Sequence, residues 1–205
     1  LTQATVSHAN IKSIDTSEAE KMPGVFKVIT YKDILAAGGT NKINGLVMLP
    51  KHNKTDGFER PVLCSDKIFQ FGDAIAIVAA DTEAHARAAA DAVKVEIEEL
   101  PAYMNAMEPD AIEIHPGIPN VFYETNCIKG PDFDWDSIPD AQQVEIESYC
   151  SRQPHLHLEP DCGYGYIDED GMVTVHSKSI GIHLHMPMIA GGIGVPMEEL
   201  RLVQN

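Results

Sequence analysis

The sequence predicts an α/β (α+β) protein, and three observations support this fold class. Short segments with alternating or β-branched apolar residues recur along the chain, which is typical of strands. An alanine-rich segment at 82–94 lies between two such segments and has the composition of a helix. The hydrophobic share of 44% over 205 residues is enough for a core, and 22% charged residues is ordinary for a globular protein of one or two domains.

The first 61 residues predict strands and short helices joined by loops. Alternating polarity predicts the first strand, and Ser17 to Glu20 has the pattern of a capping box that opens a short helix. Pro23 and Gly24 end that helix. The predicted elements are a strand at 7–15, a short helix from 17, a strand at 25–30, a short helix at 31–37 and a loop-rich stretch at 38–61.

Residues 68–100 predict a strand, a helix and a second strand. IFQFGDAIAIVAA forms the first strand, with Gly72-Asp73 as a turn or bulge near its start. Thr82 or Asp81 caps the alanine-rich helix, and VEIEEL forms the second strand. A β-α-β unit favours parallel pairing of its strands, and the alanine face lets the helix lie close to the sheet.

The second half changes character after Pro101. Six prolines and several acidic residues between 101 and 140 predict a linker across a surface. Beyond it, QVEIESYC at 143–150 predicts a strand, and Glu169-Asp170-Gly171 predicts the turn of a hairpin. A helix is expected at 185–194, with Pro187 early and glycines at its end, before a last strand.

Charge and hydropathy exclude several classes of protein. A formal net charge of -16 argues against nucleic acid and against anionic membrane surfaces, because both need clustered Lys and Arg. No apolar run approaches the roughly 20 residues of a membrane-spanning helix. The chain begins at Leu1 without the features of a signal peptide and ends on a strand-like segment. We therefore expect a cytoplasmic protein and an internal piece of a larger chain.

The spacing of the four cysteines matches no usual metal-binding motif. They are Cys64, Cys127, Cys150 and Cys162, with no CxxC pair, so the usual zinc and iron–sulfur patterns are absent. An even number permits disulfides. Lone buried thiols are favoured, because a chain of this size has enough core residues without them.

Two pairs of histidines are the first candidates for chemistry. His155, His157 and Glu159 share one face if the chain is extended, and His183 and His185 repeat the same spacing. Imidazoles and a carboxylate suit zinc or iron. Packed or hydrogen-bonded histidines are the alternative and are commoner. No dinucleotide or phosphate-loop motif occurs, and Gly191 to Gly194 fits a helix end better than a phosphate loop.

Four segments, in order, resemble the molybdenum hydroxylases, the family of xanthine dehydrogenase and aldehyde oxidase. Residues 65–102 resemble the family's strand, alanine-rich helix and strand, and RQPHLHLEPD resembles the start of its molybdenum-cofactor domain. Within the family, the segments RQPHL and ELPAYM are similar to those of the aldehyde oxidoreductases of sulfate-reducing bacteria. The segments are residues 7–25, 65–102, 152–161 and 176–196.

This resemblance implies a domain organisation and a set of site residues. It implies a hammerhead-like α/β domain at 1–103, a linker at 104–140 whose residues 129–140 do not match the family, and the first part of the molybdopterin-binding domain at 141–205. Ile180 and Gly181 would face the cofactor, and Leu184 would line the substrate funnel. Xanthine dehydrogenases carry a glutamine where Ile180 stands, which favours aldehyde substrates.

The resemblance also implies an activity. The whole enzymes oxidise aldehydes to carboxylic acids with oxygen from water, using molybdopterin, here expected as the cytosine dinucleotide, with molybdenum and two [2Fe–2S] clusters. The catalytic glutamate and the clusters would lie outside this chain, and no protein ligand would hold the metal. Expected partners are the aldehyde, the rest of the enzyme chain, an electron acceptor protein and a second copy in a homodimer. A fragment alone should be inactive.

Two other functions stay open at this point. The histidine pairs could form a zinc or iron enzyme, and stoichiometric metal that is lost on changing His155 to Ala would favour it. An acidic interaction module without catalysis would show a stable chain with no ligand and a large exposed apolar patch.

Overall fold

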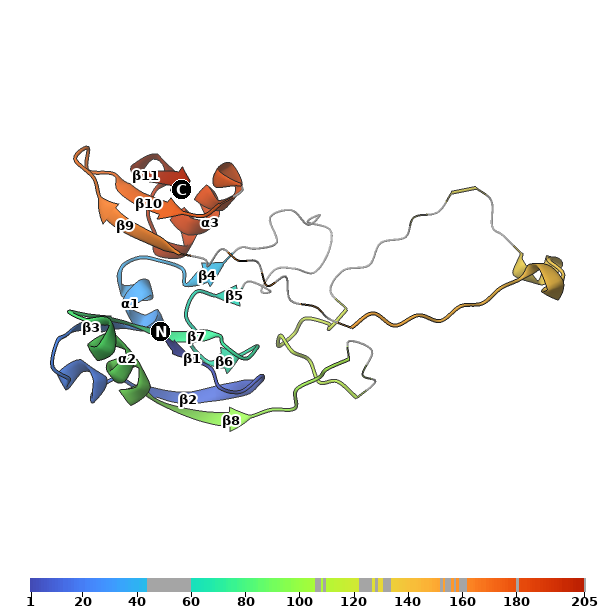
Figure 1. The fold of residues 1–205 in the computed structure, drawn as a ribbon, viewed down its shortest axis with the longest axis horizontal. Helices are drawn as coiled ribbons and strands as arrows, with labels where there is room; N and C mark the ends of the chain where they lie inside the picture. The colour runs from blue at the N-terminus through green and yellow to red at the C-terminus, as the bar shows by residue number, and fades with distance from the viewer. Residues whose placement is uncertain are drawn as a thin grey trace.

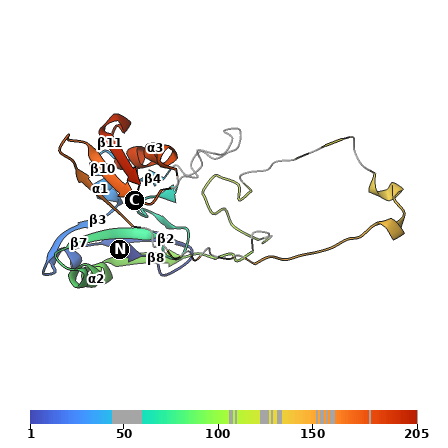
Figure 2. The same ribbon diagram turned by 45° about the horizontal axis from the view of Figure 1, so that its top comes forward.

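The computed structural model forms two compact units joined by an extended segment (Figure 1). It describes residues 1–43, 60–105, 108, 110–121, 127, 129–130, 134–151, 153, 156, 158, 162–179 and 181–204. We call 1–43 with 60–100 the N-terminal unit and 162–204 the C-terminal unit. The described part of 101–151 runs away from both units in two views (Figures 1 and 2). The mixture of sheets and helices confirms the predicted fold class.

The N-terminal unit contains two three-stranded sheets and a short hairpin. One sheet has the order β6-β2-β8 and the other β1-β7-β3, and every pair in them is antiparallel. The elements are β1 (Thr2–Gln3), β2 (Ala9–Asp15), the 3-10 helix η1 (Ala19–Lys21), β3 (Val25–Ile29), α1 (Tyr31–Ala36), β4 (Lys42–Ile43), β5 (Arg60–Pro61), β6 (Lys67–Ile68), β7 (Ala74–Ala80), α2 (Glu83–Ala92) and β8 (Lys94–Glu99).

The predicted parallel pairing of the β-α-β unit is wrong. β7 and β8 lie in different sheets, so the helix between them connects two sheets rather than two neighbours in one. A helix between two strands can connect strands of the same sheet or of two different sheets. Here β8 pairs with β2 instead of β7. The close approach of the alanine face is confirmed, because Ala89 and Ala90 are buried.

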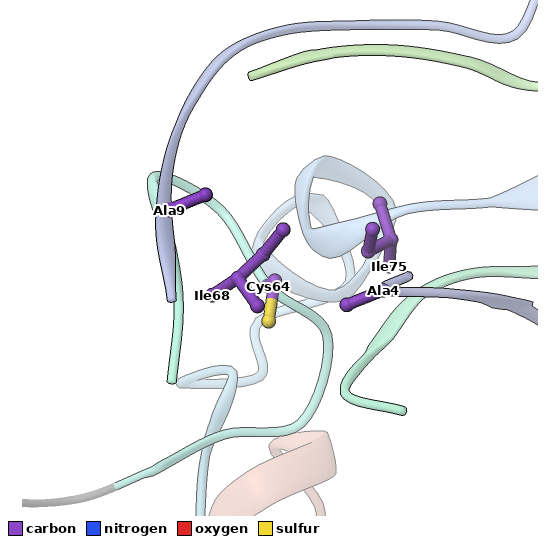
Figure 3. Packing of buried hydrophobic residues seen from close by; sticks show 5 residues of the cluster. All are labelled: Ala4, Ala9, Cys64, Ile68 and Ile75. Atoms are coloured by element: carbon purple, nitrogen blue, oxygen red, sulfur yellow. The ribbon is translucent and has the colours of Figure 1, made fainter. Parts of the chain in front are cut away.

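Strand β7 forms the centre of the core because both of its faces are covered. Ile75 packs in a cluster with Ala4, Ala9, Cys64 and Ile68 (Figure 3). Neighbouring side chains of a strand point to opposite faces. The next residue of β7 accordingly joins a second cluster, with α2 and β3, whose buried members are Ala19, Val28, Ala76, Ala89 and Val93.

The thiols differ from the prediction. All four cysteines are free, but only Cys64 is buried, while Cys127, Cys150 and Cys162 are exposed. Burial, with a smaller contribution from the nearby charge of Asp73, raises the pKa of the Cys64 thiol to about 12. Cys64 is therefore an inert core residue at neutral pH.

Helix α2 begins at a polar cap, as the sequence predicts. Thr82 is the N-cap, and its hydroxyl accepts a hydrogen bond from His85 N at 3.2 Å. We expect Thr82→Ala to lower the free energy of unfolding of the N-terminal unit by about 1 kcal/mol. Urea unfolding followed by circular dichroism measures this. Thr82→Ser, which keeps the hydroxyl, should stay near wild type, and an equal loss in both variants would contradict the capping role.

The short helix near residue 17 differs in detail from the prediction. It is a 3-10 helix, and no side chain caps its first residue. The capping box forms instead at α1, where Thr30 and Asp33 bond reciprocally. Thr30 N donates to the Asp33 carboxylate at 2.9 Å.

The C-terminal unit is a three-stranded sheet with one helix. The predicted hairpin is confirmed, since β9 (Gly163–Ile167) and β10 (Val173–Ser177) pair antiparallel around the turn. The predicted helix is also confirmed and begins earlier, as α3 (Ile182–Ile193), and Gly194 ends it in the left-handed conformation. After the 3-10 helix η4 (Met197–Glu199), β11 (Leu200–Gln204) pairs parallel with β10.

The strand predicted at 143–150 is wrong. The segment has no assigned strand and is exposed throughout, with Val144 84% and Ile146 81% accessible. Its alternating pattern has no partner strand among the described residues, and a strand needs such a partner for its backbone hydrogen bonds. The linker before it contains 3-10 turns η2 (Trp135–Ser137) and η3 (Asp140–Gln142).

Asp168 joins the three strands of the C-terminal sheet and gives it a pH dependence. Its carboxylate accepts hydrogen bonds from the Thr174 hydroxyl at 2.7 Å and Met172 N at 2.9 Å, and it pairs with Arg201 on β11. The Thr174 bond, followed by the Met172 bond and the Arg201 charge, lowers the pKa of Asp168 below its ordinary value of 3.8.

A depressed carboxyl pKa stabilises the fold above the ordinary pKa and loses this contribution as the pH falls through the lowered one. We expect the urea midpoint of the wild type to fall more steeply than that of Asp168→Asn between pH 5 and 2. Asp170→Asn, at the more exposed partner of Arg201, is the control. Parallel pH profiles of the wild type and Asp168→Asn would contradict this account.

Within the described residues, no helix combines the length and apolar character needed to cross a membrane.

Candidate functional site

The turn between β10 and α3 contains the predicted site residues that the structure describes. We call described residues 178, 179 and 181–185 the β10–α3 turn. Gly181 is the N-cap of α3, and its carbonyl accepts hydrogen bonds from Leu184 N and His185 N, both at 2.9 Å. These bonds close the first turn of the helix directly after the end of β10.

Ser179 fixes this turn from inside. It is 4% exposed, and its hydroxyl oxygen accepts a hydrogen bond from Gly181 N at 3.2 Å. The same oxygen lies 2.6 Å from His185 Nδ1. One buried hydroxyl therefore links the end of the strand to the first helical turn. The sequence reasoning missed Ser179, because this residue lies two positions before the N-cap Gly181 and so outside the usual capping position.

The electrostatics of the turn contrast with the rest of the chain. The chain contains 31 Asp and Glu residues, but none lies between 172 and 197. The turn holds Lys178 and the first N–H groups of α3, which carry partial positive charge. The arrangement therefore suits a neutral or anionic group and lacks a carboxylate that could repel one.

The three predicted site residues have different outcomes. Ile180 lies outside the described residues. Gly181 and Leu184 lie together at the start of α3, where Leu184 is half-buried. A Cβ at Gly181 would lie 3.6 Å from the Leu184 Cβ, which is an ordinary contact. The described neighbours therefore leave room for a side chain at 181, and the roles of these residues stay predictions.

The second histidine pair does not form a joint site. His183 and His185 both lie in α3, and residues two apart on a helix point to different sides. His183 is exposed, whereas His185 bonds to Ser179. His155, His157 and Glu159 lie outside the described residues. Among the residues that are described, no group of three His, Cys, Asp or Glu side chains could hold a metal ion.

A separate cavity of about 430 Å³ lies at the edge of the N-terminal unit. Its lining includes Phe69, His115, Tyr103 and His8, and no predicted site residue lines it. His8 Nδ1 lies 2.6 Å from Pro101 O and donates to it, because a carbonyl only accepts. Among the described residues, the buried His8 Nε2 atom has no hydrogen-bond partner.

Two family models match the chain in succession. The model for "Aldehyde oxidase and xanthine dehydrogenase, a/b hammerhead domain" matches residues 1–101. The model for "Molybdopterin cofactor-binding domain" matches residues 114–205, which include the whole β10–α3 turn. Between them the two models leave only residues 102–113 unmatched.

Known proteins are similar to this chain over nearly its whole length. The aldehyde oxidoreductase of Megalodesulfovibrio gigas is 54% identical over all of this chain, which covers 22% of that protein. The xanthine dehydrogenase/oxidase of Felis catus is 36% identical over 98% of the chain, covering 14% of its length. The solved aldehyde oxidoreductase from Desulfovibrio desulfuricans is 56% identical with a TM-score of 0.88, over 100% of this chain and 23% of that one.

The chain thus spans less than a quarter of each of these relatives. The two family models match in order, the identity is high over the whole chain, and the fold matches that of a solved relative. This chain belongs to the aldehyde oxidase and xanthine dehydrogenase family, and it consists of an a/b hammerhead domain followed by residues of the molybdopterin cofactor-binding domain.

Proposed function

We propose that this chain is part of a molybdenum hydroxylase that oxidises aldehydes to carboxylic acids. The observation that carries the proposal is the identity of 54% over the whole chain to an aldehyde oxidoreductase, against 36% to a xanthine dehydrogenase/oxidase. The described residues contain no group of three side chains for a metal site, so nothing in them favours the zinc or iron alternative.

The β10–α3 turn is the part of this chain that meets the cofactor in our proposal. Gly181 and Ile180 would contact it, and Leu184 would line the approach of the aldehyde. The absence of acidic residues from 173 to 196 and the partial positive charge of the helix start fit a cofactor with phosphate and oxygen groups. We expect the cytosine dinucleotide form of molybdopterin.

The overall reaction consumes one aldehyde and one water and yields one carboxylic acid, two protons and two electrons. When bound, the molybdenum cofactor would supply the activated oxygen and take up the electrons. The described side chains of the turn offer no carboxylate as a general base. Their part would therefore be to hold the cofactor and to shield it from water. Ser179 fixes the turn, and the apolar Leu184 side chain helps to exclude water.

The remaining parts of the enzyme are assigned by proposal. We propose the domain limits 1–103, 104–140 and 141–205, with the catalytic glutamate and two [2Fe–2S] clusters elsewhere in a longer cytoplasmic chain. Electrons would pass through the clusters to an acceptor protein, and the enzyme would form a homodimer. The chain's coverage of less than a quarter of its relatives leaves room for these parts.

Steady-state kinetics of the full-length enzyme that contains this chain test the activity. We expect stoichiometric molybdenum and reduction of an artificial electron acceptor on addition of acetaldehyde or benzaldehyde, with little reduction on addition of xanthine. Xanthine oxidation without aldehyde oxidation would place the enzyme in the purine branch. Aldehyde oxidation by molybdenum-free enzyme would reject the cofactor assignment.

A further inference from the structure

The two units meet where two glycine-containing backbones touch. A Cβ at Gly39, in the loop after α1, would lie 2.6 Å from the carbonyl oxygen of Gly192 in α3. A Cβ at Gly194 would overlap the carbonyl of Gly38. Neither contact tolerates a side chain, so the absence of Cβ atoms sets how closely the units approach. We call Gly38, Gly39, Thr40, Gly192 and Gly194 the glycine junction.

A hydrogen bond across the junction caps the end of α3. Thr40 Oγ donates to Gly191 O at 2.9 Å. The last four carbonyls of a helix lack partners within it, and Gly191 O is one of them. The end of α3 is thus completed by a residue that lies 151 positions away in the other unit.

Small buried residues, Ala190 and Gly192, also pack at this end of the helix. A cavity of about 260 Å³ lies beside the junction, between Ile34 of α1 and Ile193 of α3. Gly192 also lies over β4, where a Cβ would be 3.5 Å from Lys42 O. Close contacts between backbones therefore contribute to the position of α3 relative to the N-terminal unit.

The other end of α3 is the β10–α3 turn. The helix has 12 residues, so it is a rod of about 18 Å between the junction and that turn. Pro187 lies between the ends and has no N–H to donate to the carbonyl of His183, so this part of the helix has one backbone hydrogen bond fewer, while Ser179 bonds to His185. A shift at the junction will displace the turn.

We propose that the glycine junction positions the β10–α3 turn against the cofactor, with Gly39 and Thr40 as positioning residues. This inference rests on the proposed function for the identity of the ligand. The first unit would thus contribute to the reaction by setting the place of α3, without touching substrate or cofactor.

The main test compares two glycine-to-alanine changes in the full-length enzyme. Gly39→Ala places a Cβ against Gly192 O, so the backbones must separate by roughly 1 Å to restore normal contact. The same Cβ would lie 2.7 Å from Ile34 Cγ2 within the N-terminal unit, so the Ile34 side chain must also move. Gly191→Ala is the matched control, because a Cβ there meets nothing within 4 Å. The readouts are kcat and KM for an aldehyde, molybdenum content, and hydrogen exchange of the amides of residues 182–185 in cofactor-free enzyme.

For Gly39→Ala we expect kcat to fall by about 10- to 100-fold, because a misplacement of about 1 Å has effects of this size. Exchange at 182–185 should quicken, while molybdenum content stays near that of wild type. Gly191→Ala should match wild type in all three. Unchanged exchange and kcat in Gly39→Ala, or equal losses in both variants, would overturn the proposal.

A second pair of variants, at Thr40, tests the role of the glycine junction if Gly39→Ala does not fold. Thr40→Val removes the hydrogen bond to Gly191 O, together with the acceptor of Lys42 N, with little change of shape, and Thr40→Ser keeps both bonds. We expect faster exchange at 182–185 in the valine variant and rescue by serine, and identical exchange in both would overturn the proposal. A wild-type enzyme that contains no molybdenum, or that does not oxidise aldehydes, would contradict the proposed function. The hydrogen-exchange results would still test whether the glycine junction positions the turn.

Discussion

Replacing Asp73 with alanine is expected to destabilise the N-terminal unit by about 1–3 kcal/mol, the typical cost of leaving a buried backbone N–H without its acceptor. The Asp73 side chain is 6% accessible and pairs with Arg60. Its other oxygen accepts hydrogen bonds from Phe69 N at 2.9 Å and Gln70 N at 3.0 Å. The change leaves an unpaired guanidinium and two backbone donors at the turn between β6 and β7.

Urea unfolding of the chain, followed by circular dichroism, measures this loss. Asp66→Ala is the matched control, because Asp66 is exposed and its carboxylate accepts a hydrogen bond from the Ser65 hydroxyl rather than from backbone N–H groups of the turn. We expect that control to stay within about 0.5 kcal/mol of wild type. Similar losses in the two variants would show that charge alone, rather than the buried bonds of Asp73, sets the stability.

Truncation of Ile75 to alanine should lower the free energy of unfolding by about 2–5 kcal/mol. Ile75 is 2% exposed and packs with Ile68, Cys64 and two alanines in the cluster of Figure 3. Small neighbours such as Ala4 and Ala9 cannot fill the space that the lost methyl groups leave. A cavity therefore adds to the loss of buried apolar area.

Ile77, two residues further along β7, provides the control for Ile75. It is 37% exposed, so Ile77→Ala should cost clearly less than Ile75→Ala in the same urea experiment. The comparison keeps the strand, the residue type and the number of deleted atoms the same. Equal losses at the two positions would contradict the deeper burial of Ile75 in the core.

Local features of this fold could be predicted from the sequence, because they depend on neighbouring residues. The cap at Thr82, the hairpin turn before Gly171 and the helix end at Gly194 each follow from side-chain or glycine chemistry within a few positions. The pairing of β8 with β2 depends on contacts between residues about 85 positions apart. A β-α-β pattern does not specify such a partner.

In the candidate site too, local features could be predicted from the sequence and long-range contacts could not. Gly181 and Leu184 were placed by resemblance, and the structure brings them together at the start of α3. The sequence suggested that His183 and His185 form a pair, but helical geometry separates two residues at this spacing. The contact of Gly39 with Gly192 could not be predicted, because each glycine alone only indicates a loop or a helix end.

The central claim is that the β10–α3 turn meets a molybdopterin cofactor. The most direct measurement is anomalous diffraction at the molybdenum absorption edge from crystals of the full-length enzyme. The account predicts one strong molybdenum peak per chain next to the turn that contains Gly181, with Leu184 on the side from which the aldehyde approaches. A peak far from the start of α3, or a metal bound by His155 and His157 instead, would contradict it.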